Sequence, residues 1–437
     1  MDMAVLLCGA AERLATPKLG LEIPGYFGGR RASGVKSDLY TQALVLDDGN
    51  EVLVLISVDI VDFLPAFSRK IRARLAKSIG VKPSAVMTVA THTHTGPPSN
   101  YTCLDSKKST AAMQRLEDLT VEAAEAAFAN RCPVRMFAGA GEVHGISFVR
   151  NYFTKDGGGC TNPAPSMRDN VGERITKADY GVEVLRFEAQ NGKTMAHVVN
   201  FACHPDVVGG NEYCADWPGE MRRVLKENFG ADSVSLFLNG CAGNINHVDA
   251  YRTMEGHRYP KDHYVYMGET VAAEVLRIDC EESEEMTDVT LAATSKSFRA
   301  ARRQPTEEML ERARAVLADP ESKRHHRIYA KEHIALAKHP KHFENVEVQV
   351  LRIGDCGVVG LPGEIYCDTG LAIKAASPFA HPLVSELANG TVGYVATEPA
   401  FSFGVYEAKL GKYNSSLYPA AANKMVELAS KLQHKLK

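Results

Sequence analysis

Apolar runs along the chain predict β-strands that alternate with helices. The runs 40–46 and 51–58 are typical of strands, and Asp47-Asp48-Gly49-Asn50 between them indicates a hairpin. An amphipathic stretch then predicts a helix over 64–80, and 86–91 returns as a strand. A strand, a helix and a strand in this order predict a parallel pair with a right-handed crossover.

The rest of the chain continues this mixture of patterns. We expect helices over 111–130, from Asp216 and over 420–436, a hairpin of 181–189 with 194–202, and strands over 233–238, 346–353 and 357–361. The glycine-rich segment 155–169 predicts a mobile loop that closes over a substrate, and about 304–339 predicts a helical insertion. Residues 1–437 are therefore expected to form a single large α/β domain, whose mixed core of one or two sheets is flanked by helices.

Composition excludes several classes of protein. The chain has 437 residues, with 50 Lys and Arg against 53 Asp and Glu, so its net charge is −3. The chain therefore lacks the basic excess that would indicate a nucleic-acid partner. No run approaches the roughly 18 apolar residues of a membrane span, so we expect no stable membrane insertion. The ten cysteines include no CxxC pair, and the N-terminus lacks the cationic segment of a signal peptide. Both observations favour a reduced, cytoplasmic protein. The pattern does not predict an oligomeric state.

Two histidine segments are the first candidates for chemistry. In Thr91-His92-Thr93-His94 the imidazoles are two residues apart, so on a strand they would share a face at its end. His204, before Pro205, follows another predicted strand. A divalent metal is a natural partner for such rings. Hydrogen-bonded structural histidines are an equally good explanation for the His92–His94 segment taken alone, and the better one for His204 taken alone.

Three further segments carry polar groups with ordinary structural explanations. Glu364 lies where a strand turns toward a helix, and it could be a first-turn acid. Tyr394 and Tyr406 could be core tyrosines. The glycine-rich turn 239–247, which includes Asn246, could hold donors around an oxyanion or form only a turn.

The order and spacing of these segments together resemble the N-terminal catalytic domain of the neutral/alkaline non-lysosomal ceramidase family. The similarity runs from Cys8-Gly9-Ala10-Ala11 through His92-Thr93-His94-Thr95-Gly96-Pro97 and Phe201-Ala202-Cys203-His204 to Pro362-Gly363-Glu364 and Tyr394-Val395-Ala396-Thr397. It covers nearly the whole chain. The His-Thr-His-Thr-Gly-Pro and Tyr-Val-Ala-Thr stretches are its most specific parts.

The resemblance implies a zinc-dependent hydrolase of an amide (N-acyl) bond that uses a zinc-activated water. The residues matching the family's zinc ligands are His92, His204, Glu364 and Tyr394. Positions matching catalytic residues are His94, which contacts the reacting group, Arg150, which would grip a polar or anionic substrate end, and Tyr406. We further expect Asp59 and Asp216 to orient the metal-bound imidazoles.

Two departures from the family leave the substrate open. Asn246 occupies the position of the family's catalytic serine, and the family's C-terminal immunoglobulin-like domain has no counterpart. Asn246 could still donate a hydrogen bond to an oxyanion, or it could cap the turn after Gly243. We therefore expect a small-molecule or lipid-like acyl substrate. The alternatives are an esterase or lactonase on the same Zn²⁺ centre, and a non-catalytic metal-binding relative.

Overall fold

Two β-sheets form the centre of the computed structural model, which describes residues 5–99, 106–287, 289–412 and 414–437. The larger sheet has nine strands, in the order β16-β14-β13-β8-β1-β5-β6-β7 with β18 paired to β8, and the smaller has the order β19-β20-β21-β23. Their bounds are β1 (Leu7–Leu14), β5 (Tyr40–Asp47), β6 (Val52–Val58), β7 (Val86–Ala90), β8 (Cys132–Glu142), β13 (Gly181–Ala189), β14 (Thr194–Phe201), β16 (Val234–Asn239), β18 (Glu284–Met286), β19 (Leu291–Ala301), β20 (Phe343–Ile353), β21 (Cys356–Gly360) and β23 (His381–Ser385).

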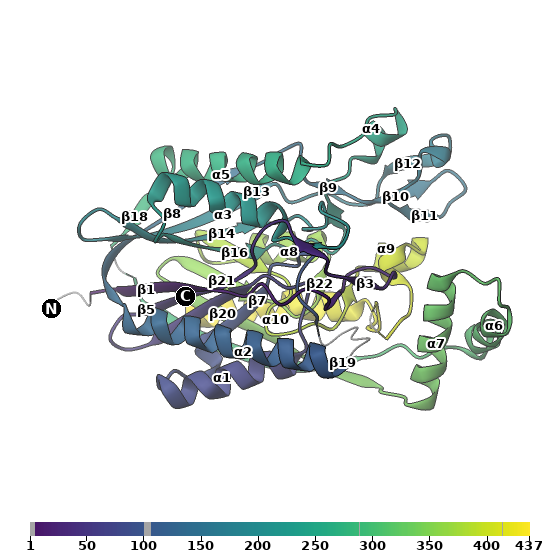
Figure 1. Cartoon of the computed structure of the whole chain (residues 1–437), viewed down its shortest axis with the longest axis horizontal. Coiled ribbons are helices and arrows are strands. Elements are labelled where there is room, and N and C mark those ends of the chain that lie inside the picture. Colours follow the sequence, from purple (N-terminus) through teal and green to yellow (C-terminus); the bar gives the residue numbers. More distant parts are fainter. Residues whose placement is uncertain (1–4, 100–105, 288, 413) are drawn as a thin grey trace.

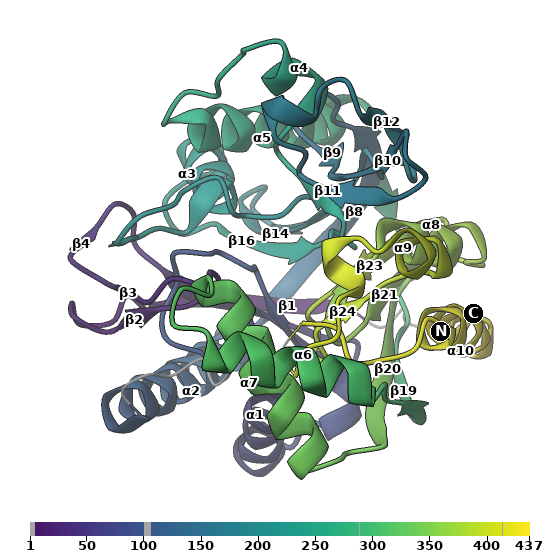
Figure 2. The ribbon, with the colours of Figure 1, turned by 90° about the vertical axis from the view of Figure 1, so that its right-hand side faces the viewer.

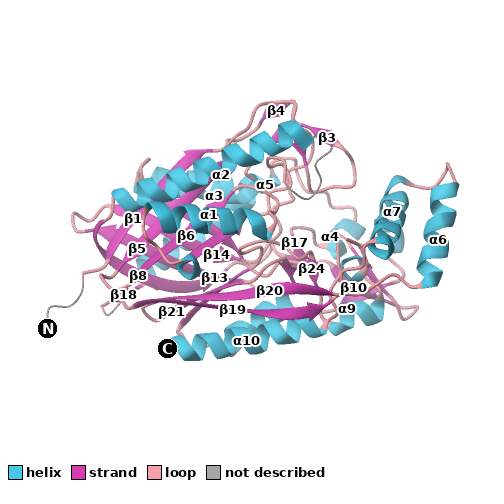
Figure 3. Cartoon of the chain, turned by 90° about the horizontal axis from the view of Figure 1, so that it is seen from below, coloured by secondary structure: helices cyan, strands magenta, loops and turns pink. Residues whose placement is uncertain are grey.

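Helices cover the outer faces of the two sheets (Figure 3). They are α1 (Pro65–Ser78), α2 (Ser106–Ala129), α3 (Asp216–Phe229) and α5 (His263–Glu281) on the larger sheet, and α8 (Cys367–Ala375) and α10 (Ala420–Leu436) on the smaller. Between the sheets, apolar side chains such as Val198 of β14 and Leu351 of β20 belong to one continuous buried cluster. The predicted single α/β domain is confirmed, with two sheets.

Parallel strand pairs occur in both sheets and determine where the chain can place polar groups. The predicted pair of β6 and β7 is parallel and is connected by α1. β14 and β16 are likewise parallel around α3, and β21 and β23 around α8. The carboxyl ends of such strands are where α/β proteins gather function. Here the segments that follow β7, β14 and β21 carry His92, His204 and Glu364.

Short ladders complete the fold near this edge. They pair β2 (Glu22–Ile23) with β3 (Arg30–Arg31), β4 (Gly34–Val35) with β15 (Glu212–Tyr213), β9 (Phe148–Val149) with β17 (Ile245–Asn246), and β22 (Glu364–Ile365) with β24 (Tyr394–Val395). Two short helices, α4 (Ala250–Met254) and α9 (Glu398–Phe403), lie in the connections.

Two segments differ in detail from the sequence-based expectation. The segment 155–169 is not simply a loop, because β11 (Gly159–Thr161) pairs with β10 (Asn151–Thr154), which also pairs with β12 (Val171–Arg174). The predicted helical stretch at 304–339 folds as two helices, α6 (Glu307–Ala318) and α7 (Arg324–Lys338), which stand at one end of the molecule (Figures 1 and 2). Among the described residues, no helix is long and apolar enough to cross a bilayer.

Candidate metal centre

Three buried imidazoles meet at the carboxyl ends of β7 and β14. Nε2 of His92 lies 3.1 Å from Nε2 of His204 and 3.2 Å from Nε2 of His94. The three rings are within reach of a single ion and form the one such group of three found among the described residues. The sequence-predicted histidines are therefore brought together.

The backbone reason for this convergence differs from the predicted one. β7 ends at Ala90, so His92 and His94 are not on a strand and do not share a face through strand alternation. His92 instead has a left-handed backbone, with φ of 74°, which turns its ring toward His94 and His204. Such a conformation costs a non-glycine residue of the order of 1–3 kcal/mol and is found where a site requires it.

Backbone carbonyl groups, and not carboxylates, orient the imidazoles of His92 and His204. Nδ1 of His92 lies 2.6 Å from the carbonyl oxygen of Val61, and Nδ1 of His204 lies 2.8 Å from that of Ala242. Each Nδ1 therefore donates its proton to a carbonyl oxygen, and Nε2 is the nitrogen that can bind a metal in place of a proton. The expectation that Asp59 and Asp216 perform this task is wrong.

Both aspartates have structural partners elsewhere. Asp59 accepts two hydrogen bonds from the guanidinium of Arg222, at 2.9 and 2.6 Å. Asp216 begins α3 with φ of 57° and accepts from the backbone nitrogens of Val208 and Trp217. Asp59 thus fastens α3 to the end of β6, and Asp216 supports the first turn of α3.

Glu364 completes the polar centre from the short strand β22. Its Oε2 lies 3.4 Å from Nε2 of His92 and 3.3 Å from Nε2 of His204, yet it makes no well-directed hydrogen bond. Glu364 is not a first-turn helix acid, because it begins β22 and precedes α8 by three residues. Gly363 before it has φ of 112°, and a Cβ there would lie 2.5 Å from the carbonyl oxygen of Gly393. Only glycine suits this close approach.

Tyr394 and Arg150 lie next to Glu364. Tyr394 is the register partner of Glu364 across β22 and β24, and its hydroxyl accepts a hydrogen bond of 3.1 Å from Nη2 of Arg150. The Nε of Arg150 donates to Oε1 of the fully buried Glu407 at 2.8 Å, and Nη2 also donates to the carbonyl oxygen of Gly243. Protein groups thus already accept hydrogen bonds from Nε and Nη2 of Arg150.

The electrostatics of the centre favour a cation. Burial opposes charge on His92, but the Glu364 carboxylate raises the pKa of His92 to about 9. Burial likewise opposes ionisation of Glu364, but His92 and His204 hold the pKa of Glu364 well below its usual range. Burial, together with His92, lowers the pKa of His94 well below its usual value, so this ring stays neutral.

These residues fit a zinc ion. Imidazole nitrogens and a carboxylate oxygen are the ligands that zinc prefers, and a buried carboxylate oxygen without a hydrogen-bond donor needs a positive partner. The three histidines whose nitrogens lie within reach of one ion include His94. The ligand set expected from the resemblance includes Glu364 and Tyr394 instead of His94. The two sets share His92 and His204.

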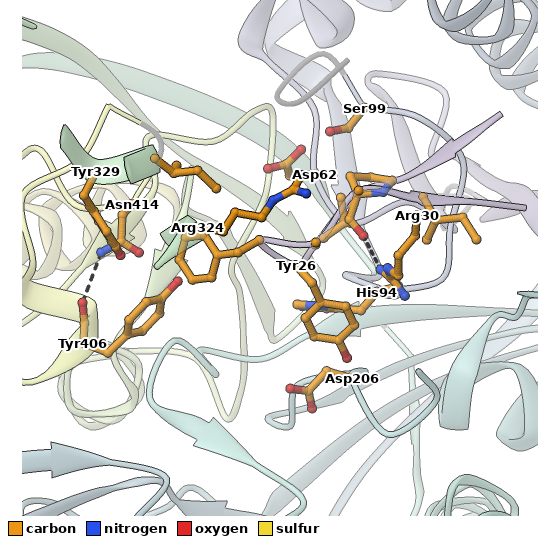
Figure 4. A pocket seen from close by; sticks show the side chains of 18 of the residues that line it. Tyr26, Arg30, Asp62, His94, Ser99, Asp206, Arg324, Tyr329, Tyr406 and Asn414 are labelled. Carbon is orange, nitrogen blue, oxygen red and sulfur yellow. Dashed lines mark hydrogen bonds between the residues drawn. The ribbon is translucent and has the colours of Figure 1, made fainter. Parts of the chain in front are cut away.

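A cavity of about 820 Å³ opens onto this centre. Its lining includes the predicted residues His92, His94, Arg150, Glu364, Tyr394 and Tyr406. Figure 4 shows His94 and Tyr406 among the lining side chains. It also includes groups that the sequence analysis missed: the 24–29 loop with Tyr26 and Phe27, and one side of α7. The run Pro24-Gly25-Tyr26-Phe27-Gly28-Gly29, in which aromatic residues stand among glycines, was the available signal for the loop.

Asn246 lies beside the cavity and not in the lining. Its Nδ2 donates to Oδ1 of Asn162 at 2.9 Å, and its Oδ1 accepts from the backbone nitrogen of Val248 at 3.0 Å. Asn162 does line the cavity, and it has a left-handed backbone with φ of 48°. Asn246 therefore supports a turn and also holds a residue of the cavity wall.

Comparison with known proteins supports this architecture. No protein-family model and no curated protein sequence matches the chain. Among solved structures, the neutral ceramidase from Pseudomonas aeruginosa matches with a TM-score of 0.72 and 19% identity over 99% of this chain and 75% of that one. A ceramidase complexed with C2 matches with the same TM-score and identity, over 99% of this chain and 76% of the other. The resemblance seen in the sequence is confirmed at the level of the fold, and the chain has the fold of the neutral ceramidases.

Proposed function

We propose that the chain is a zinc-dependent hydrolase of an amide (N-acyl) bond, similar to the ceramidases. The observation that carries this proposal is the convergence of three imidazoles and an unsatisfied carboxylate at a cavity of about 820 Å³. The ceramidase-like fold and the ceramidase complexed with C2 support an acyl substrate.

His92, His204, Glu364 and Tyr394 would hold the zinc ion. Bound there, zinc would polarise a carbonyl group and lower the pKa of water to near neutrality. The neutral His94 ring reaches the same point from the cavity side, where it can contact the reacting carbonyl or accept a proton. In hydrolysis, water adds to the carbonyl carbon, the C–N bond breaks, and a proton passes to the departing amine.

Tyr406 is our proposed donor to the developing oxyanion. Burial raises the pKa of Tyr406 to about 12, so its hydroxyl keeps its proton at neutral pH. Its ring stands edge-on to Tyr394, with centroids 5.8 Å apart, and it lines the cavity. A preorganised neutral donor in this place stabilises charge that appears only in the transition state.

Arg150 and Asn246 support the centre from behind in this proposal. Arg150 presents a positive charge to the Tyr394 hydroxyl and to a polar substrate end. Asn246 acts through Asn162, whose amide nitrogen is the group available to a substrate oxygen because Oδ1 already accepts from Asn246.

A paired measurement tests the proposal. The purified chain is assayed for bound metals and for turnover of a panel of chromogenic amides and esters. We expect zinc and zinc-dependent cleavage of amides. Cleavage of esters alone would identify an esterase or lactonase, and bound zinc without any turnover would identify a non-catalytic relative.

A further inference from the structure

The wall of the cavity opposite the sheets carries an excess of positive charge. Helix α7, from Arg324 to Lys338, has the sequence RHHRIYAKEHIALAK, with Glu332 as its one acidic residue. Arg324, Arg327 and Lys331 on this helix line the cavity. The basic side of α7 therefore faces the space in which a substrate would bind.

Most of the cations around the cavity are already engaged. Nη1 of Arg327 donates to the carbonyl oxygens of Val316 and Asp319. Arg30 donates to the carbonyl oxygens of Pro24, His94 and Gly210, and Arg150 is paired with Glu407. Arg30 and Arg327 thus stabilise the walls of the cavity, and the charge of Arg150 is balanced by Glu407.

Arg324 is different. It has no ion pair or hydrogen bond from its side chain within the part of the chain that the structure describes. It is the first residue of α7, where the helix dipole disfavours a cation, and the first turn contains no acid to offset this. In Figure 4 its side chain extends from α7 toward the middle of the cavity. The guanidinium of Arg324 thus lies at a helix end where the dipole disfavours its positive charge, and its side chain extends into the cavity.

The acids that line the cavity do not neutralise Arg324. Glu364 faces His92 and His204, Asp206 pairs with His247 at 3.2 Å, and Glu22 pairs with Arg31. Glu332 accepts from the backbone nitrogen of Lys412. The Asp62 carboxyl is hydrogen-bonded to Ser99 and forms no ion pair with Arg324 among the described residues. The exposed guanidinium of Arg324 is therefore available to an anion that enters the cavity.

An apolar surface faces the same space. Tyr26 and Phe27 of the 24–29 loop are 45% and 40% exposed, although both line the cavity. The Phe27 ring lies 5.8 Å from the Tyr329 ring of α7 and 6.3 Å from that of Tyr406. An acyl chain placed against these rings would remain close to the basic side of α7.

We propose that the substrate carries an anionic group, a carboxylate or a phosphate, which Arg324 binds while the metal centre acts on the amide. A guanidinium suits both anions because it can donate two parallel hydrogen bonds. Lys331, two turns along α7, adds to the positive potential. This inference rests on the proposed amide hydrolysis and specifies its substrate class as N-acylated compounds with a negative charge.

Matched neutral and anionic amides test the proposal. One pair, N-octanoylglycine and N-octanoylglycinamide, differs by a charge on the amine side. The other pair, octanedioic acid monobenzylamide and N-benzyloctanamide, differs by a charge at the end of the acyl chain. We expect the zinc-loaded protein to favour the anionic member of one pair by about tenfold in kcat/KM, mainly through KM. Arg324→Gln should abolish this preference.

Arg312→Gln is the matched control, because Arg312 is an exposed arginine on α6 that pairs with Glu308 and does not line the cavity. It should keep the preference. Equal turnover of charged and neutral members, or a preference that survives Arg324→Gln, would overturn the anion site alone. Calorimetric binding of the same compounds separates the two proposals. Charge-selective binding that Arg324→Gln removes, without any turnover, would refute amide hydrolysis and retain the anion site.

Discussion

Glu364 and Tyr394 are opposite one another in a two-stranded parallel ladder, in which the backbone nitrogen of Glu364 donates to the carbonyl oxygen of Gly393 at 3.0 Å. The carboxylate and the phenol of the candidate centre are therefore positioned by backbone pairing. A shift of this short ladder would move both side chains together.

Gly363→Ala should disturb this ladder. The new Cβ would lie 2.5 Å from the carbonyl oxygen of Gly393, and the backbone already has φ of 112°. We expect weaker zinc binding and a lower unfolding temperature, measured by zinc titration and calorimetry. Gly49→Ala is the control, because Gly49 has φ of 84° but no atom near its added Cβ. Equal zinc affinity in both variants would show that the ladder does not position the ligands.

His92→Ala and His204→Ala should each abolish stoichiometric zinc, because Nε2 of each ring points at the common centre. Elemental analysis should find about one zinc per chain in the unmodified protein and in His339→Ala, whose exposed ring has no role in the centre. Full zinc occupancy in both His92→Ala and His204→Ala would refute the site. Zinc content of His94→Ala then decides whether His94 is a ligand or only contacts the substrate.

Asp59→Ala should destabilise the fold without removing zinc. It leaves the buried guanidinium of Arg222 without its carboxylate, and breaking such a pair costs about 3–5 kcal/mol. Urea unfolding measures the loss, and metal analysis of the folded variant gives the zinc content. Loss of zinc at unchanged stability would restore Asp59 to the role of orienting an imidazole.

Asn246→Ala should reduce kcat by about 100-fold with zinc still bound, since it releases Asn162 from its position in the cavity wall. Asn162→Ala should produce a similar loss, and the double variant should lose little more, because the two residues act as one unit. Unchanged turnover in Asn246→Ala with lower stability would reduce Asn246 to a turn-supporting residue.

Asp216 predicts a specific pH dependence of stability. Burial raises the pKa of Asp216 to about 6 in the folded protein, whereas an unfolded aspartate has a pKa of about 3.9. Between these pH values the folded state keeps a proton that the unfolded state has lost. The contribution of Asp216 to the free energy of unfolding is therefore fully present below about pH 4 and is lost as the pH rises to about 6.

Asp216→Asn removes this titration. Denaturant unfolding at several pH values should show that the variant loses less stability than the parent between pH 4 and 6, with a difference of at most about 3 kcal/mol. Parallel pH profiles for the two proteins would contradict the raised pKa.

The sequence predicted those parts of the molecule that local pattern determines. The hairpin of β5 and β6, the crossover through α1 and the closing helix α10 follow from periodicity and turn residues. His92 and His204 could be identified as candidate metal ligands because each follows a predicted strand. The family resemblance supplied Glu364 and Tyr394, which local pattern alone would have assigned to a helix start and to the core.

Long-range partners could not be predicted in the same way. Arg222 is an ordinary helix residue in the sequence, and only the packing of α3 against the larger sheet brings it to Asp59. The carbonyl groups that orient His92 and His204 are present in every peptide unit, so no side-chain pattern identifies them. The contact of α7 with the 24–29 loop joins segments that have no shared periodicity.

The positions of the candidate ligands along the chain also determine when each of them becomes available during synthesis. Roughly 300 residues separate His92 from Tyr394, and at about 5–20 residues per second a ribosome needs about 15–60 s to add them. During that interval the two histidines of the first segment exist without the carboxylate and phenol that complete their surroundings. If the proposed ligand set holds zinc, the ion would be bound only after residue 394 has been made, and a nascent chain halted before Glu364 should not retain it.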